Sequence, residues 1–407
     1  MENEKILKIV ESSHFNFLIG SGASRNYLET LQNIEGLLTD LDNESKENKT
    51  EEWYKLLEVS IKFWYYDKCI RGNSKLIDKD FELHGNKLSE FQETNQNYIK
   101  FLQALNILVL KRRNKLLPKE VNLFTTNMDL FLDINLDNLG LEFNDGFSGK
   151  FTQTFNTANY QKSFFKNSSQ YNVSSELPLF NLYKLHGSLT WDKSYPNEIR
   201  YNANVSVLAA LNNIVFPEKY LVELVSIKGT GSAKKWITRT FEDLKKEAKD
   251  IADLIGLDSN IETFATEYDK LVMINPTKEK FENTTLRLEY YEQMRMYSNI
   301  LERENSVLFV TGFSFADEHI RQITYRALNS NPTLLVVVYN YSEEGRKSVE
   351  SFFPKLKYKN LYTDLVGYDF KKVTEEVFLK LAEQFDAVLA KMNENEAVIK
   401  VAKKDGK

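Results

Sequence analysis

Short apolar runs that end in polar or glycine residues form the main pattern of this chain. Such runs are typical of buried parallel strands, because both faces of a parallel sheet are covered. The five runs are residues 16–19, 121–124, 271–274, 306–310 and 334–339. Polar or glycine-containing clusters follow four of them, at residues 20–24, 125–129, 312–314 and 340–342. In an open parallel sheet, ligands bind beyond the carboxyl ends of the strands, so we expect these clusters along one edge.

Longer segments between the runs favour helices. We expect helical insertions at about residues 27–118 and 190–268, with the clearest helical spacing of apolar residues from 232 to 268. A closing helix is expected at 368–392. The predicted fold class is therefore α/β, a Rossmann-like parallel sheet flanked by helices, with large helical insertions. We expect the main domain to span 1–342, followed by a C-terminal strand and helix extension over 343–407.

Composition and the cysteine count indicate the cellular compartment in which the protein folds. With 407 residues and 42% hydrophobic content, the chain can bury a large core. The single cysteine, Cys69, cannot form an intramolecular disulfide, and no set of cysteines is present for a structural zinc site. Residues 1–5 lack the order of a signal peptide, and the apolar stretch 334–338 is too short for a bilayer. We expect a cytoplasmic protein without a membrane partner.

The charge balance argues against nucleic acid as a direct partner. The chain carries 58 acidic and 53 basic residues, for a formal net charge of -5. Basic clusters at 111–113 and 403–404 are short, and runs of this kind are usually solvated helix faces or tails.

The first polar cluster has the arrangement of a phosphate-binding turn. A strand is followed by Gly20, Ser21, Gly22, Ser24 and Arg25 at a predicted helix start, where backbone N–H groups can meet a pyrophosphate. Arg25 stands where the dehydrogenase fingerprint has its third glycine, which disfavours hydride transfer. A tight connection between a strand and a helix explains the same residues equally well.

The second cluster supplies an amide and a carboxylate on one turn. Asn127 and Asp129 can hold a carboxamide and a ribose, or can cap the helix that follows. Of the four histidines, His186 is followed by a glycine that permits an irregular backbone. We treat His14 and His84 as structural, and we place His319 at a helix start, with a role in the site as the alternative.

Together these motifs resemble the sirtuin superfamily, in its branch of bacterial sirtuin-like proteins associated with anti-phage defence. Residues 20–24 are similar to that family's Gly-Ala-Gly-x-Ser loop, and 125–129 to its Thr-Gln-Asn-Ile-Asp motif, with threonine in place of glutamine. His186-Gly187 corresponds to the His-Gly pair, and residues 312–314 resemble the Gly-Thr-Ser loop. Residues 275–281 and 312–320 further resemble the defence branch.

The resemblance implies roles for individual residues. Asp129 would bind the nicotinamide carboxamide of NAD+, Asn127 would position the ribose or the attacking water, and His186 would be the general base. The expected cofactor-binding residues are Gly20, Ser21, Gly22, Ser24, Arg25, Thr125, Gly312, Ser314 and Asn340, the last two on the adenosine side.

The resemblance also implies an activity. Deacylating sirtuins carry a four-cysteine zinc module that this chain lacks, so we expect no metal and an NAD+ hydrolase that releases nicotinamide and ADP-ribose. A homo-oligomer and a HerA-type hexameric ATPase partner are also implied. The alternatives are a deacylase or ADP-ribosyltransferase, a non-catalytic NAD or ADP-ribose sensor, and a structural scaffold.

Overall fold

The centre of the molecule is a seven-stranded sheet in which every neighbouring pair is parallel. The computed structural model describes residues 3–30, 34–112, 114, 116–194, 198–217, 220–228, 235–273 and 288–384. The strand order is β15-β14-β13-β1-β2-β8-β3. The strands are β1 (His14–Ile19), β2 (Glu120–Thr125), β3 (Phe143–Asn144), β8 (Leu179–Lys184), β13 (Ser306–Thr311), β14 (Leu335–Asn340) and β15 (Leu361–Val366). Without the edge strand β3, this is the strand order of a doubly wound nucleotide-binding sheet, which confirms the predicted fold class.

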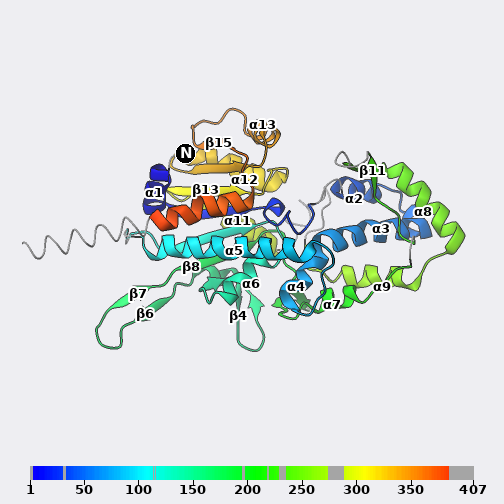
Figure 1. Cartoon of the computed structure of the whole chain (residues 1–407), viewed down its shortest axis with the longest axis horizontal. Helices are drawn as coiled ribbons and strands as arrows, with labels where there is room; N and C mark the ends of the chain where they lie inside the picture. Colours follow the sequence, from blue (N-terminus) through cyan, green and yellow to red (C-terminus); the bar gives the residue numbers. More distant parts are fainter. Residues whose placement is uncertain are drawn as a thin grey trace, which may run out of the picture.

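Helices cover both faces of the sheet (Figure 1). On one face lie α1 (Asn3–Ser12), α5 (Lys87–Leu110), α6 (Phe131–Asn138) and α14 (Phe370–Lys372) with its π-helical continuation Val373–Leu379. On the other lie α11 (Leu288–Leu301), α12 (Glu318–Ser330) and α13 (Glu343–Phe352). Alternate residues of one strand face opposite sides, so Phe17 of β1 joins the first core and Leu18 joins the second.

A ladder of buried asparagines crosses the sheet on the side of the second core. The Nδ2 of Asn122 donates to Oδ1 of Asn16 at 2.8 Å, and the Nδ2 of Asn181 donates to Oδ1 of Asn122 at 3.0 Å. Asn144 continues the ladder at 3.2 Å from Asn181. These residues are paired across β1, β2, β8 and β3. Because a shift of one residue would leave the amides unpaired, the ladder fixes the register of these four strands.

A third apolar core lies in a helical subregion beside the sheet (Figure 1, right). Its helices are α2 (Ile34–Asp42), α3 (Glu52–Tyr65), α4 (Ser74–Ile77), α7 (Ser206–Asn212), α8 (Phe241–Ile255) and α9 (Ser259–Tyr268). Both predicted insertions therefore contribute to one core, whereas α5, which also falls within 27–118, packs on the sheet. The domain boundary at 342 stays a prediction, and β15 beyond it pairs with β14.

Small antiparallel sheets complete the fold. They are formed by β4 (Phe147–Ser148), β5 (Thr154–Phe155), β10 (Glu198–Tyr201) and β9 (Trp191–Ser194), by β11 (Val225–Lys228) and β12 (Lys235–Thr238), and by β6 (Phe165–Asn167) and β7 (Ser174–Glu176). The β6–β7 hairpin projects from the body (Figure 1).

The expected strand at 271–274 is wrong over its described residues. Met273 forms only an isolated antiparallel bridge, with Gly187. Leu271 and Met273 pack in the core of the helical subregion, and Val272 packs beside Trp191, so this apolar run is buried away from the sheet. Ile274 and the motif at 275–281 lie outside the described residues. The expected closing helix begins at Phe370. The structure describes it as far as residue 384.

Among the helices of the described part of the chain, none is both long and apolar enough to cross a bilayer.

Candidate functional site

A cavity of about 800 Å³ brings the predicted site residues together. It lies at the loops that follow β1 and β13, where the chain winds outward in opposite directions and where sheets of this type bind ligands. Ten of the twelve predicted residues line it: Ser21, Gly22, Ser24, Arg25, Asn127, Asp129, His186, Gly312, Ser314 and Asn340. Gly20 and Thr125 are the two that are not among its lining residues.

The β1 and β13 loops interlock through their glycines. The backbone N–H of Gly22 donates to the carbonyl of Gly312 at 2.9 Å. A Cβ on Gly20 would lie 2.4 Å from the oxygen of Gly312, and a Cβ on Gly312 would lie 2.4 Å from the nitrogen of Ala23. Gly312 also has a φ of +63°, in the left-handed region that favours glycine. These glycines therefore permit close loop contact, and their binding of a pyrophosphate stays a prediction.

Thr125 and Gly20 do not line the cavity, but both hold Asn127 in position through hydrogen bonds. The Thr125 hydroxyl donates to the carbonyl of Ile19 at 2.9 Å and accepts from the backbone N–H of Asn127 at 3.0 Å. The Nδ2 of Asn127 donates to the carbonyl of Gly20 at 3.0 Å. The Oδ1 of Asn127 is buried, and no described residue provides it with a hydrogen-bond partner. Asn127 lines the cavity, and an unpaired buried acceptor of this kind needs an explanation such as a bound donor.

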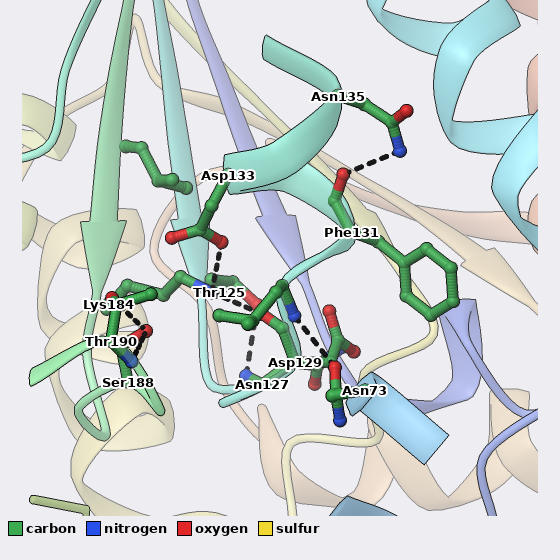
Figure 2. Close-up of polar contacts among 12 residues, drawn as sticks. Asn73, Thr125, Asn127, Asp129, Phe131, Asp133, Asn135, Lys184, Ser188 and Thr190 are labelled. Atoms are coloured by element: carbon green, nitrogen blue, oxygen red, sulfur yellow. Dashed lines mark hydrogen bonds and ion pairs between the residues drawn. The ribbon is translucent and has the colours of Figure 1, made fainter. Parts of the chain in front are cut away.

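Asp129 is buried against the β1 loop. The Ser24 hydroxyl donates to Oδ2 of Asp129 at 2.6 Å and lies 3.0 Å from the Tyr98 hydroxyl. Burial raises the pKa of Asp129, while the Lys184 charge and the Ser24 hydrogen bond oppose the rise. Figure 2 shows Lys184 of β8 near Asp133 and Asp129; its Nζ lies 2.6 Å from Asp133 and donates to the carbonyl of Asp129. The carboxylate is thus fixed between the glycine turn and a buried ion pair.

Asp145, a third carboxyl group near this ion pair, is expected to make the stability of the protein depend on pH. Burial, with a smaller contribution from the Asp133 charge, raises the pKa of Asp145 to about 6. The folded protein therefore holds this proton at pH values where the unfolded chain has released it, so stability falls as pH rises from about 4 to about 6. Asp145→Asn keeps the acceptor for the backbone N–H of Phe147 and removes the charge. Above pH 6 we expect the variant to be more stable by about 1–3 kcal/mol.

Thermal unfolding at pH 8 and below pH 4 measures this effect. The variant should melt higher than the wild type at pH 8 and alike at the lower pH. Asp364→Asn, at an exposed position of β15, is the matched control and should change neither value. An equal gain at both pH values would show that the charge of Asp145 is not the cause.

His186 follows β8 and pairs with a residue that the sequence analysis did not select. Its Nε2 lies 3.0 Å from Oδ2 of Asp317, and both side chains are largely buried. Gly187 has a φ of +85°, and a Cβ there would lie 2.3 Å from the carbonyl of Val272, so a glycine is required beside the histidine. The available sequence signal for Asp317 was its place as an acidic residue before α12, within the stretch 312–320 that follows β13.

The other histidines lie elsewhere. His84 lines a second cavity of about 630 Å³, and His14 begins β1, where burial lowers its pKa. His319 lies in the first turn of α12. None of the three lines the candidate site in the described part of the chain. The described residues contain no group of three or more His, Cys, Asp or Glu that could hold a metal ion.

Comparisons with known proteins find little at the sequence level. No protein-family model matches the chain, and no curated protein matches it. Among solved structures, a triple mutant of a Sir2 homologue in complex with 2'-O-acetyl ADP ribose aligns over 95% of this chain and 98% of that chain. The identity is 12% and the TM-score 0.31. At these values the alignment carries no argument, so the fold class rests on the observed sheet and the site on its residues.

Proposed function

We propose that the protein is an NAD+ glycohydrolase that cleaves the nicotinamide–ribose bond. The observation that carries the proposal is that Asn127, whose Oδ1 has no hydrogen-bond partner among the described residues, and His186 line one cavity at the switch point of the sheet. An amide and a base that line the same cavity suit a substrate with hydroxyl groups and a water to be activated.

The chemistry places modest demands on the protein. When the bond between C1' of the ribose and the pyridinium nitrogen breaks, its electron pair goes to the nitrogen and nicotinamide leaves as a neutral molecule. The positive charge that remains is shared between C1' and the ring oxygen. Water then bonds to C1' and gives up a proton, which we assign to His186 as general base. Orientation and electrostatics supply most of the rate enhancement in such a reaction.

Several other residues of the cavity have binding roles in the proposal. Asn127 would accept a hydrogen bond from a ribose hydroxyl or the attacking water through Oδ1. Asp129, held by Ser24, would contact the nicotinamide carboxamide. Gly22 and Arg25 would contact the pyrophosphate, and Arg25 already stands 5.6 Å from the ring centre of Tyr341 at the cavity wall. Ser314 and Asn340, after β13 and β14, would lie on the adenosine side.

The test is release of nicotinamide and ADP-ribose from NAD+ by the purified chain without an acceptor. We expect equal amounts of the two products. His186→Ala should lower kcat by about 10²-fold, because water attack loses its base. His84→Ala, a histidine outside this cavity, is the matched control and should retain full activity.

The alternatives give different product patterns. Nicotinamide release only when an acyl-lysine peptide or another protein acceptor is supplied would replace hydrolysis by transfer. Binding of NAD+ or ADP-ribose without turnover, unchanged by His186→Ala, would identify a sensor. No release and no binding would overturn the assignment of the cavity to this substrate.

The role in anti-phage defence, the homo-oligomer and the HerA-type ATPase partner belong to the same proposal and rest on the motif resemblance. Light scattering of the chain alone, and of the chain mixed with such an ATPase, measures the assembly directly. Assaying NAD+ cleavage in the same mixtures asks whether the partner is needed for turnover.

A further inference from the structure

The carboxylate of Asp317 divides its two oxygens between a helix and the site histidine. Oδ1 accepts hydrogen bonds from the backbone N–H groups of His319 and Ile320, at 3.1 and 3.3 Å, and so caps α12. Oδ2 lies 3.0 Å from Nε2 of His186. The cap fixes the carboxylate, because rotating it toward another partner would expose two helix N–H groups. The imidazole therefore faces a fixed acceptor.

A strained loop delivers Asp317 to this position. Phe315 has a φ of +59°, although a bulky residue is disfavoured in the left-handed region by about 1–2 kcal/mol. The conformation is held by packing: the Phe315 ring is fully buried and makes edge contacts with Phe313 at 5.2 Å and Phe353 at 5.0 Å. Arg321 also donates to the carbonyl of Phe315 at 2.9 Å. Backbone strain held by its surroundings in this way is typical of functional sites.

We propose that Asp317 is a positioning residue for His186. An ionised carboxylate only accepts hydrogen bonds, so at 3.0 Å it favours the ring form that carries the proton on Nε2, and Nδ1 of the neutral ring is then the nitrogen left to accept one. The carboxylate also stabilises the imidazolium that forms when His186 takes a proton. The catalytic part of this role rests on the proposed function, whereas the choice of tautomer belongs to the resting protein.

Asp317→Asn separates these roles because it keeps the cap. Its Oδ1 can still accept from the two N–H groups of α12, but its Nδ2 donates where the carboxylate accepted. Nε2 must then become an acceptor, and the ring proton moves to Nδ1. The same exchange in an Asp–His pair of a serine protease leaves the geometry intact and gives the wrong tautomer.

Nitrogen-15 NMR of the histidine rings at alkaline pH tests the tautomer without any turnover. The chain has four histidines, and the His186 signals are those lost in His186→Ala. We expect the Nε2–H form in the wild type and the Nδ1–H form in Asp317→Asn. The same tautomer in both proteins would overturn the proposal, whether or not the chain cleaves NAD+.

Kinetics tests the catalytic part. Asp317→Asn should lower kcat by about 10²-fold, no more than removal of the base itself, with KM nearly unchanged. The matched control is Asp258→Asn, because Asp258 also caps a helix, α9, and is not among the described residues that line the cavity. Full kcat in Asp317→Asn with the wild type active would overturn the positioning role. An inactive wild type would instead refute the proposed function and leave the NMR result to decide the tautomer.

Discussion

Asn127→Ala is expected to lower kcat for NAD+ cleavage by about 10³-fold while leaving the melting temperature almost unchanged. The rate is expected to fall because Asn127 lines the cavity in a fixed position: Nδ2 donates to the carbonyl of Gly20, and Oδ1 has no hydrogen-bond partner among the described residues. Stability changes little because two effects offset. The lost hydrogen bond contributes about 1 kcal/mol, and the removed, unsatisfied acceptor costs about 1–3 kcal/mol.

Asn135→Ala is the matched control and should show the reverse pattern. Asn135 lies on α6, and its Nδ2 donates to the carbonyl of Phe131 at 2.8 Å (Figure 2). The same nitrogen donates to Oδ1 of Asn95 at 2.8 Å. It is buried and hydrogen-bonded but is not among the described residues that line the cavity. Its loss should lower the melting temperature and leave kcat unchanged. A large loss of stability in Asn127→Ala with normal kcat would mean that Asn127 only shapes the turn.

Apolar runs predicted the middle of the sheet well. The runs at 16–19, 121–124, 306–310 and 334–339 correspond to β1, β2, β13 and β14, because strands buried on both faces are mostly apolar. β8 was not predicted. Its Asn181 and Lys184 break the apolar pattern, although both are buried, one in the asparagine ladder and the other in the ion pair with Asp133. Partners from other strands satisfy these polar groups, and a single strand does not reveal them.

The run at 271–274 shows the opposite error. Hydrophobic residues predict burial, but not the core in which they are buried. Leu271 and Met273 pack with the helices of the subregion. Their apolar pattern is that of a buried strand, but the residues are buried in the core of the helical subregion and not in the sheet. The edge strand β15 was also missed as part of the sheet, because it is only partly buried and its apolar pattern is interrupted by Thr363 and the exposed Asp364.

Local motifs predicted most residues of the candidate site, and tertiary contacts supplied the rest. The glycine turn and Asn127 follow their strands directly, so the parallel arrangement alone brings them to one edge. The pairing of Asp317 with His186 joins the ends of β8 and β13, which neither neighbour each other in the sheet nor lie close in sequence. The sequence around either residue therefore could not predict that His186 and Asp317 are close in space.

Gly312→Ala is expected to destabilise the protein by about 2–4 kcal/mol and to lower kcat/KM by at least about 10²-fold. The new Cβ would lie 2.4 Å from the backbone nitrogen of Ala23 and 3.0 Å from the carbonyl oxygen of Gly20. These are main-chain atoms, so the clash cannot be relieved by turning a side chain. The β1 loop must move away from the β13 loop, which displaces the turn that would hold the pyrophosphate. A displacement of about 1 Å in such a site can cost about 10²-fold in rate.

Gly140→Ala isolates the loop contact from the backbone conformation. Gly140 has a φ of +61°, close to the +63° of Gly312, but no atom lies within 4 Å of its added Cβ. Its alanine variant should therefore show only the conformational cost, about 1–2 kcal/mol, with normal activity. Calorimetry and initial rates on both variants measure the difference. If Gly312→Ala behaves like Gly140→Ala in both respects, the interlocked loops yield to a methyl group and do not fix the geometry of the site. A larger loss in Gly312→Ala assigns the excess to the contact between the two loops, since the backbone cost is common to both.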